Sequence, residues 1–122
     1  MIINHFISKA KNMNVDFTYS GTLVSNLNIK DRKLYILLSN ALENAFIHCA
    51  LPKTVKLDMG CVGEYCRFVI TNTYKEKQEE RKGYGIISMK KIIEEVNGEI
   101  NFEIQNDLYI CSILIPIQEK IH

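Results

Sequence analysis

The sequence predicts an α/β two-layer sandwich, in which three helices cover one face of a mixed, mostly antiparallel sheet of about five strands. Apolar residues recur at helical spacing in three segments, and they alternate with polar residues in the segments between and after them. Two strands follow the last helix directly, so the sheet cannot be wholly parallel. Three helices on one side are enough to bury one face of such a sheet.

Size and composition predict a single domain over residues 1–122. A chain of 122 residues with 47% hydrophobic and 24% charged residues has the composition of a globular protein. Its formal charge of +1 lacks the basic excess of a general nucleic-acid binder. No apolar run approaches the roughly 20 residues that span a bilayer, and the first residues lack the apolar centre of a signal peptide. We therefore expect a cytoplasmic segment with no nucleic-acid partner and no direct membrane contact.

The N-terminal half predicts a helix, a strand and a long helix. Residues 2–12 place apolar side chains at helical spacing, and residues 15–19 alternate as a strand with one buried face does. A polar loop follows, in which Asn28 or Asp31 is expected to cap the long helix by accepting bonds from free backbone amides. This helix is expected to end near Pro52. Its apolar stripe consists of Leu34, Leu37, Leu38, Ala41, Leu42 and Ala45.

The C-terminal half predicts two antiparallel hairpins with a helix between them. About ten polar residues, TYKEKQEERK, separate the first hairpin from the helix and are expected to form a mobile loop. The helix begins at glycines and ends at Asn97-Gly98, a good C-terminal stop. The predicted strands are residues 54–59 and 65–71 around a turn at 60–63, and residues 99–104 and 108–115 around a turn at 105–107.

The four cysteines are Cys49, Cys61, Cys66 and Cys111. They show neither a CxxC pair nor the dense spacing of a small secreted scaffold, so reduced thiols are expected. Cys61 and Cys66 flank Val62-Gly63-Glu64-Tyr65, a second placement of the hairpin turn, where a cross-strand disulfide or half of a metal site is the alternative. No nearby His or Cys completes a set of four ligands.

Polar side chains form a row along the long helix. Asn40, Asn44 and His48 are spaced i, i+4 at the edge of the apolar stripe, so we expect them to be half-buried and close together. A buried amide without a partner costs roughly 1 to 3 kcal/mol, and structural amides with satisfied hydrogen bonds are one interpretation. Magnesium is the other, because it prefers oxygen ligands and bridges protein groups to nucleotide phosphates.

A second polar feature lies at the start of the last helix. The segment KGYG, residues 82–85, places Gly83 and Gly85 where free backbone amides and the helix dipole attract phosphate. An ordinary turn and helix cap is the alternative interpretation of these glycines.

Three segments together resemble the ATP-binding catalytic domain of sensor histidine kinases. This domain has the Bergerat fold of the ATPase superfamily shared by gyrase, heat-shock chaperones and mismatch-repair proteins. SNALENAFIHC, residues 39–49, looks like the kinase N box, and KGYGIISMKKIIEEVNGEI, residues 82–100, looks like the second glycine box with the following helix and strand. FVITNTYKE, residues 68–76, is similar to the variant in peptide quorum-sensing sensors, where a strand ending in Asn replaces the Asp-x-Gly-x-Gly box. The resemblance extends over nearly the whole chain.

The resemblance implies a site for ATP and Mg²⁺. It implies that Asn44 coordinates the metal and that Asn40 orients the phosphates or the metal's water. His48 then lies beside the nucleotide, and Asn72 accepts a hydrogen bond from the adenine amino group. Arg81 is an alternative to Lys82 for offsetting phosphate charge. The remaining residues implied to bind the nucleotide are Lys82, Gly83, Tyr84 and Gly85.

The sequence departs from the family pattern at several positions. Asn40 occupies the place of the general-base glutamate of ATP-hydrolysing relatives, which disfavours efficient hydrolysis. Glu43 lies off the face of the row and is interpreted as a solvated helix residue. Ile47 stands where many such kinases have a charged residue. Residues 74–82 form a shorter lid than is usual, which implies low nucleotide affinity.

The implied activity is that of a protein-histidine kinase, with this chain as its ATP-binding part. It would hold Mg-ATP for transfer of a phosphoryl group to a histidine on another domain, so no catalytic side chain is expected within the chain, and His5 is interpreted as structural. Residues 1–12 are expected to end a helix from an absent dimerisation domain. That domain and, indirectly, a response regulator are the implied partners, and an upstream sensor region is expected to anchor the parent protein in the membrane. The alternatives are a degenerate, nucleotide-free interaction module and a free-standing Ser/Thr regulator kinase.

Overall fold

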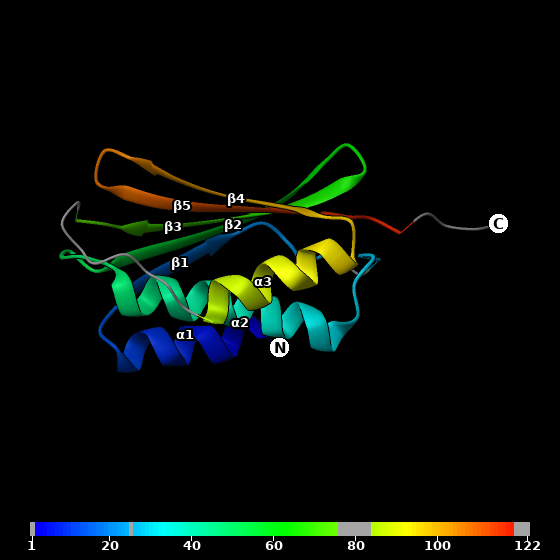
Figure 1. The fold of residues 1–122 in the computed structure, drawn as a ribbon. Helices are drawn as coiled ribbons and strands as arrows, with labels where there is room; N and C mark the ends of the chain where they lie inside the picture. Colours follow the sequence, from blue (N-terminus) through cyan, green and yellow to red (C-terminus); the bar gives the residue numbers. More distant parts are fainter. Residues whose placement is uncertain (1, 25, 76–83, 119–122) are drawn as a thin grey trace.

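The computed structural model describes residues 2–24, 26–75 and 84–118. In these ranges the helices form one layer and the sheet forms the other (Figure 1). The elements, in chain order, are α1 (Ile2–Asn12), β1 (Asp16–Ser20), α2 (Asp31–His48), β2 (Thr54–Val62), β3 (Tyr65–Thr73), α3 (Tyr84–Glu95), β4 (Glu99–Gln105) and β5 (Leu108–Pro116). This order confirms the predicted class.

The sheet has five strands in the order β1-β2-β3-β5-β4. The edge strand β1 runs parallel to β2, with α2 as the crossover between them, and the other three pairings are antiparallel. The sheet is therefore mixed and mostly antiparallel, as predicted. β3 lies at its centre, so residues at the end of β3 are enclosed from both sides.

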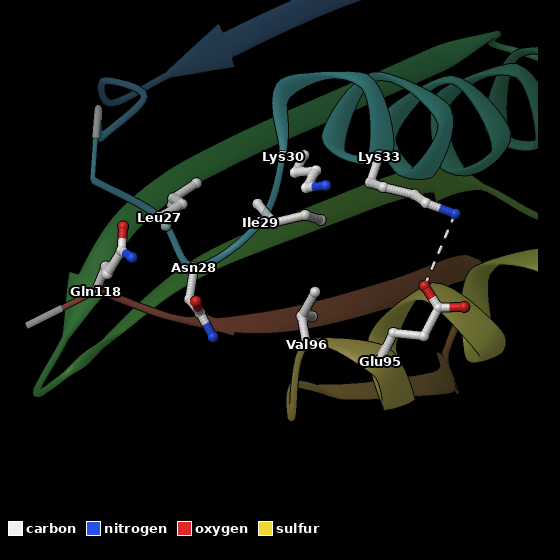
Figure 2. A pocket seen from close by; sticks show the side chains of 8 residues that line it. All are labelled: Leu27, Asn28, Ile29, Lys30, Lys33, Glu95, Val96 and Gln118. Carbon is white, nitrogen blue, oxygen red and sulfur yellow. Dashed lines mark ion pairs between the residues drawn. The ribbon is translucent and has the colours of Figure 1, made fainter.

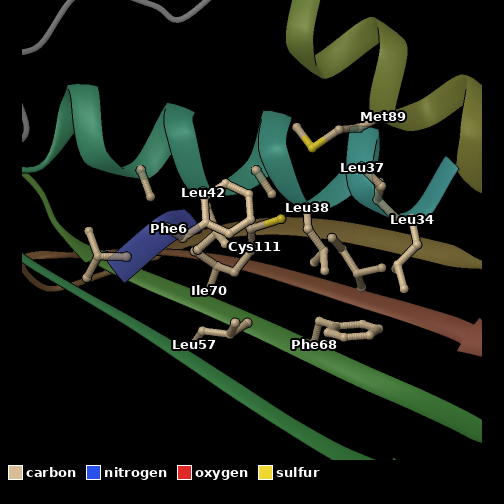
Figure 3. Packing of buried hydrophobic residues seen from close by; sticks show 14 of the residues in the cluster. Phe6, Leu34, Leu37, Leu38, Leu42, Leu57, Phe68, Ile70, Met89 and Cys111 are labelled. Atoms are coloured by element: carbon tan, nitrogen blue, oxygen red, sulfur yellow. The ribbon is translucent and has the colours of Figure 1, made fainter. Parts of the chain in front are cut away.

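The core lies between the helices and the facing side of the sheet (Figure 3). The predicted stripe of α2 is buried in full, together with Phe46. Helix α1 adds Ile3, Phe6 and Ala10, and α3 adds Met89, Ile92 and Ile93. Alternate residues of the inner strands complete the core because successive side chains of a strand point to opposite faces. They are Val55, Leu57, Cys66, Phe68, Ile70, Cys111, Ile113 and Ile115.

The predicted cap of α2 is wrong. The N-cap position is Lys30, and no side chain caps the helix there. Asp31 lies inside the first turn, where its carboxylate favours the positive end of the helix dipole. Asn28 is held elsewhere, because its backbone N–H donates to the carbonyl of Pro116 at 2.8 Å. The loop before α2 is thus fixed by the last strand instead of by a side-chain cap.

The first hairpin turns within Val62-Gly63-Glu64-Tyr65, as one placement predicts, and not at residues 60–63. β2 continues through Gly60 to Val62, so the turn of the first hairpin is Gly63-Glu64, with Gly63 at a φ of +61°. The turn of the second is Asn106-Asp107. At the end of α3, Asn97 has a φ of +58° and the N–H of Gly98 bonds to the carbonyl of Ile93 at 2.9 Å, which confirms the predicted stop.

All four cysteines are free thiols, as expected. In the part of the chain that the structure describes, no group of three or more ligating His, Cys, Asp or Glu side chains comes together. Within the same ranges, no helix combines the length and the apolar character needed to cross a membrane.

Candidate functional site

Two of the asparagines singled out in the sequence face the same small pocket. Asn44 reaches it from α2 and Asn72 from β3, between the two helices and the inner strands. The pocket has a volume of about 10 Å³, which is the space of a single water molecule. The other lining residues are Ala41, Ala45, Ile70, Met89, Phe102, Tyr109 and Cys111.

Asn72 is buried, with 2% of its surface exposed. Among the described residues, the other buried side chains are hydrophobic. The Nδ2 of Asn72 donates a hydrogen bond of 2.8 Å to the carbonyl oxygen of Thr73. This bond uses the amide nitrogen, so the side-chain oxygen Oδ1 is the group left to accept a bond from a ligand.

The end of β3 around Asn72 is braced on two sides. The carbonyl of Thr73 also accepts from the N–H of Ala50, and the Thr73 hydroxyl donates to the carbonyl of Ala50 at 2.6 Å. The N–H of Tyr74 donates to the carbonyl of Asp107 in the turn between β4 and β5 at 2.8 Å. These bonds tie the strand end to the segment after α2 and to the second hairpin, so they fix the position of Asn72.

The row on α2 has the predicted burial. Asn40, Asn44 and His48 are all half-buried, at successive turns of one helix. Only Asn44 belongs to the described lining of the pocket, whereas Asn40 and His48 lie one turn to either side. The structure therefore brings Asn44 and Asn72 together and leaves Asn40 and His48 beside the pocket.

The start of α3 lies on the same side of the molecule as Asn44. The helix begins at Tyr84, so the backbone of Gly85 lies in its first turn, and Met89 on the following turn reaches the pocket. None of the first-turn residues is acidic, which leaves the positive end of the dipole uncompensated by its own helix. Arg81, Lys82 and Gly83 fall outside the described residues, together with most of the polar segment expected to form a mobile loop.

Sequence reasoning missed the aromatic wall of the pocket. Phe102 of β4 lies 6.1 Å from Tyr109 of β5 between ring centroids, and Tyr109 lies 5.7 Å from Tyr74. The alternation of apolar residues along the last two strands could have placed Phe102 and Tyr109 on the helix-facing side of the sheet. Nothing in the sequence indicates that these two side chains lie near Asn44.

Glu43 is partly solvated, as interpreted, but it also has an ion-pair partner that the sequence did not indicate. Its Oε1 lies 2.6 Å from Nζ of Lys9 on α1, and both side chains are little more than a third exposed. The contact arises because Glu43 lies on the side of α2 that faces α1, where Tyr35 also packs near Phe6. Ile47, in contrast, is 63% exposed and offers no charge beside the row.

A larger cavity of about 480 Å³ lies at the opposite ends of α2 and α3 (Figure 2). It is bounded by the start of α2 and the end of α3, and Lys33 and Glu95 approach across its rim to 3.7 Å. None of the residues predicted to bind a ligand belongs to its described lining, and it holds no row of amides. The two asparagines that line the small pocket therefore favour it over the larger cavity as the candidate site.

The sequence matches the family described as GHKL domain over residues 27–116. This match covers the chain from the loop before α2 to the end of β5, and the chain belongs to this family. A search of curated proteins found no match.

Solved structures share the fold. The nucleotide-free catalytic domain of histidine kinase ThkA matches with a TM-score of 0.81 and 19% identity, over 95% of this chain and 88% of that one. The mycobacterial sensor histidine kinase MprB matches with a TM-score of 0.74 and 13% identity, over 98% and 95%. Histidine kinase AdeS of Acinetobacter baumannii matches with a TM-score of 0.77 and 16% identity, and this chain spans 62% of its length. The fold is thus that of histidine-kinase catalytic domains, while a closer kinship with quorum-sensing kinases stays a prediction.

Proposed function

We propose that the chain is the ATP-binding catalytic domain of a histidine kinase, which holds Mg-ATP for phosphoryl transfer to a histidine of another domain. Membership of the GHKL family supports this function. The single observation that carries it is the meeting of Asn44 and Asn72 in one pocket, from a helix and a strand that are separate in the sequence.

The two asparagines have different roles in the proposal. The side-chain oxygen of Asn44 is a ligand for Mg²⁺, which supplies charge neutralisation for the phosphates when bound. Magnesium often keeps several waters and takes few protein ligands, so it does not need a cluster of carboxylates. Asn72 accepts from the adenine amino group through Oδ1, because its Nδ2 is already bonded to Thr73. Asn40 orients the phosphates or the water on the metal, and His48 lies beside the nucleotide.

The phosphates are expected at the start of α3. Backbone amides of the first turn have no intrahelical partners, and they and the helix dipole favour anions. Tyr84 and Gly85 begin this turn. Lys82 and Gly83 immediately precede it in the sequence and complete the proposed set.

Nucleotide binding requires the pocket to open. Its volume of about 10 Å³ holds one water, so adenine enters only if Met89 or Phe102 changes its rotamer or α3 shifts. Methionine is suited to such a change because its side chain is unbranched and flexible. The closed pocket is also the observation that favours the second candidate function, a nucleotide-free interaction module of the same fold.

Catalysis in this proposal comes from positioning and from charge stabilisation. The phosphoryl acceptor is proposed to belong to another domain. His5 lies on α1 and packs edge-on against Phe6 with a ring-centroid distance of 5.1 Å, a contact that suits the structural role assigned to it. Helix α1 is proposed as the end of the helix that links the two domains. The parent kinase is proposed to be anchored by a sensor region, with this domain in the cytoplasm and a response regulator downstream.

The test is the melting temperature with and without Mg-ATP. A ligand at about 100 times its dissociation constant stabilises the native state by roughly 2.7 kcal/mol. We expect a shift in the wild type that is lost both when EDTA removes the metal and in Asn44→Ala. Asn101→Ala, an exposed residue on β4, is the matched control and should keep the full shift.

The outcomes separate the two candidate functions. An equal shift in Asn44→Ala contradicts the metal assignment. A wild type that does not respond to Mg-ATP at millimolar concentration favours the nucleotide-free module.

A further inference from the structure

Cys61 and Cys66 lie directly opposite each other on β2 and β3. Opposed residues of an antiparallel pair place their side chains on the same face of the sheet. The two-residue turn Gly63-Glu64 makes Val62 and Tyr65 the hydrogen-bonded pair that closes the hairpin, so the cysteines form the next pair, which is not hydrogen-bonded. The Cα atoms of such a pair are about 4.5 Å apart, within the range that a disulfide spans.

The two thiols differ in access to solvent. Cys66 is fully buried. Cys61 is exposed. The reason lies in the edge strand: β1 pairs with β2 only as far as Ser20 opposite Asp58, so the last residues of β2 have no paired strand on that side among the described residues.

We propose that Cys61 and Cys66 form a thiol–disulfide exchange site for small-molecule disulfides, with Cys61 as the attacking thiol and Cys66 as the resolving thiol. The thiolate of Cys61 attacks a disulfide RSSR, which forms a mixed disulfide on Cys61 and releases one RS⁻. The thiol of Cys66 gives its proton to solvent and its sulfur attacks Sγ of Cys61, which forms the cross-strand disulfide and releases the second RS⁻. In sum, two protein thiols are oxidised and one RSSR is reduced to two RSH.

The electrostatics of the pair support this order of attack. Burial, and then the neighbouring Cys61, raise the pKa of the Cys66 thiol. A buried thiol with a raised pKa is a poor first nucleophile, whereas it needs only a small thiolate fraction to resolve a mixed disulfide held beside it. The second step is therefore expected to become faster as the pH rises.

The other two cysteines do not lie opposite another cysteine in the described strand pairings. Cys111 lies opposite Ile70 on one side and Phe102 on the other. The thiol of Cys49 donates to the carbonyl of Phe46 at 3.3 Å at the end of α2. The exchange site is thus specific to the first hairpin, at residues that the proposed nucleotide site does not use.

Peptide mapping tests the proposal directly. The reduced protein is incubated under native conditions with oxidised glutathione, remaining thiols are blocked with N-ethylmaleimide, and the denatured chain is digested with trypsin. Cleavage after Lys56 and Arg67 releases Cys61 and Cys66 in one peptide, residues 57–67, which separates them from the other cysteines. We expect this peptide to lose two hydrogen atoms and to carry no maleimide.

Variants assign the two roles. Cys66→Ser should stop at the glutathione adduct of Cys61, and Cys61→Ser should keep Cys66 as a thiol that maleimide labels after denaturation. Cys111→Ser is the matched control and should form the same disulfide as the wild type. A wild-type peptide that keeps both thiols, one that stops at the mixed disulfide, or an intermolecular Cys61 dimer on a non-reducing gel overturns the proposal.

Discussion

The side-chain nitrogen of Asn72 lies 2.8 Å from the carbonyl oxygen of Thr73, so a buried amide is anchored to the end of its own strand. The same carbonyl accepts from the N–H of Ala50 at 3.0 Å. The bond from Asn72 therefore adds to one that already satisfies this carbonyl, and its main structural effect is to orient the amide.

Replacing Asn72 by Ala removes this bond and leaves space beside the pocket. We expect Asn72→Ala to lower the free energy of unfolding by about 1 to 3 kcal/mol, because a buried hydrogen bond and packed atoms are lost. Urea denaturation measures the change. Asn101→Ala, at an exposed position of β4, should stay within about 0.5 kcal/mol of the wild type. Equal effects of the two substitutions would contradict the role assigned to the buried amide.

The ion pair between Lys9 and Glu43 should stabilise the packing of α1 on α2 only modestly. Both groups are more than a third exposed, so solvent screens the attraction. We expect a double-mutant cycle with Lys9→Met and Glu43→Gln to give a coupling free energy of about 0.2 to 1 kcal/mol that falls as salt is added. The more exposed pair Lys56–Asp58, at 3.9 Å, serves as the control and should couple more weakly. A coupling that salt leaves unchanged would be inconsistent with a screened pair.

Gly21 and Gly60 should respond very differently to alanine. Gly21 has a φ of +88°, and a Cβ there would overlap with the carbonyl oxygen of Met59. We expect Gly21→Ala to lower the free energy of unfolding by at least about 3 kcal/mol, through left-handed strain and the backbone clash. A Cβ on Gly60 meets no atom within 4 Å, so Gly60→Ala should change stability by less than about 1 kcal/mol. Thermal unfolding of the two variants side by side checks the contrast, and a mild effect at Gly21 would mean that the loop after β1 shifts freely.

Cysteine alkylation should follow exposure and burial. Burial raises the pKa of the Cys111 thiol to about 12, so it stays protonated and unreactive near neutral pH. Its rate of reaction with iodoacetamide should rise with pH up to about that value as long as the protein remains folded. Cys61 is exposed and should be modified first at about pH 8. Mass spectrometry of timed samples gives the order, and urea-unfolded protein, in which all four thiols react alike, is the control. Labelling of Cys111 as fast as Cys61 in the folded protein would contradict the burial.

The fold could be predicted from sequence because its signals are local. The stripe of α2 from Leu34 to Ala45 repeats over roughly three turns of helix. Asn97 has a positive φ at the end of α3, a left-handed conformation that asparagine tolerates, so Asn97-Gly98 stops the helix. The side-chain cap of α2 was predicted wrongly because the loop before the helix is held by Pro116, a residue far away in the sequence. The turn at residues 60–63 was also predicted wrongly, since Gly60 continues a strand despite its low strand propensity, whereas the placement at Val62-Gly63-Glu64-Tyr65 was right.

The site could be predicted only in part. The spacing of Asn40, Asn44 and His48 gives a shared helix face and half-burial, which the structure has. The neighbours of that face depend on how the sheet pairs. The approach of Phe102 and Tyr109 to Asn44, and that of Lys9 to Glu43, are set by tertiary packing and have no signal in local spacing.

The brace at the end of β3 makes the two sides of the small pocket mechanically unequal. One side is pinned by main-chain bonds to Ala50 and Asp107, and the other is a helix that meets the pocket through the flexible thioether of Met89. We therefore expect a ligand that enters the pocket to displace α3 and to leave the strand in place. Amide hydrogen exchange along residues 86–93 should slow when a ligand binds in the pocket, while exchange at residues 70–73 should stay unchanged.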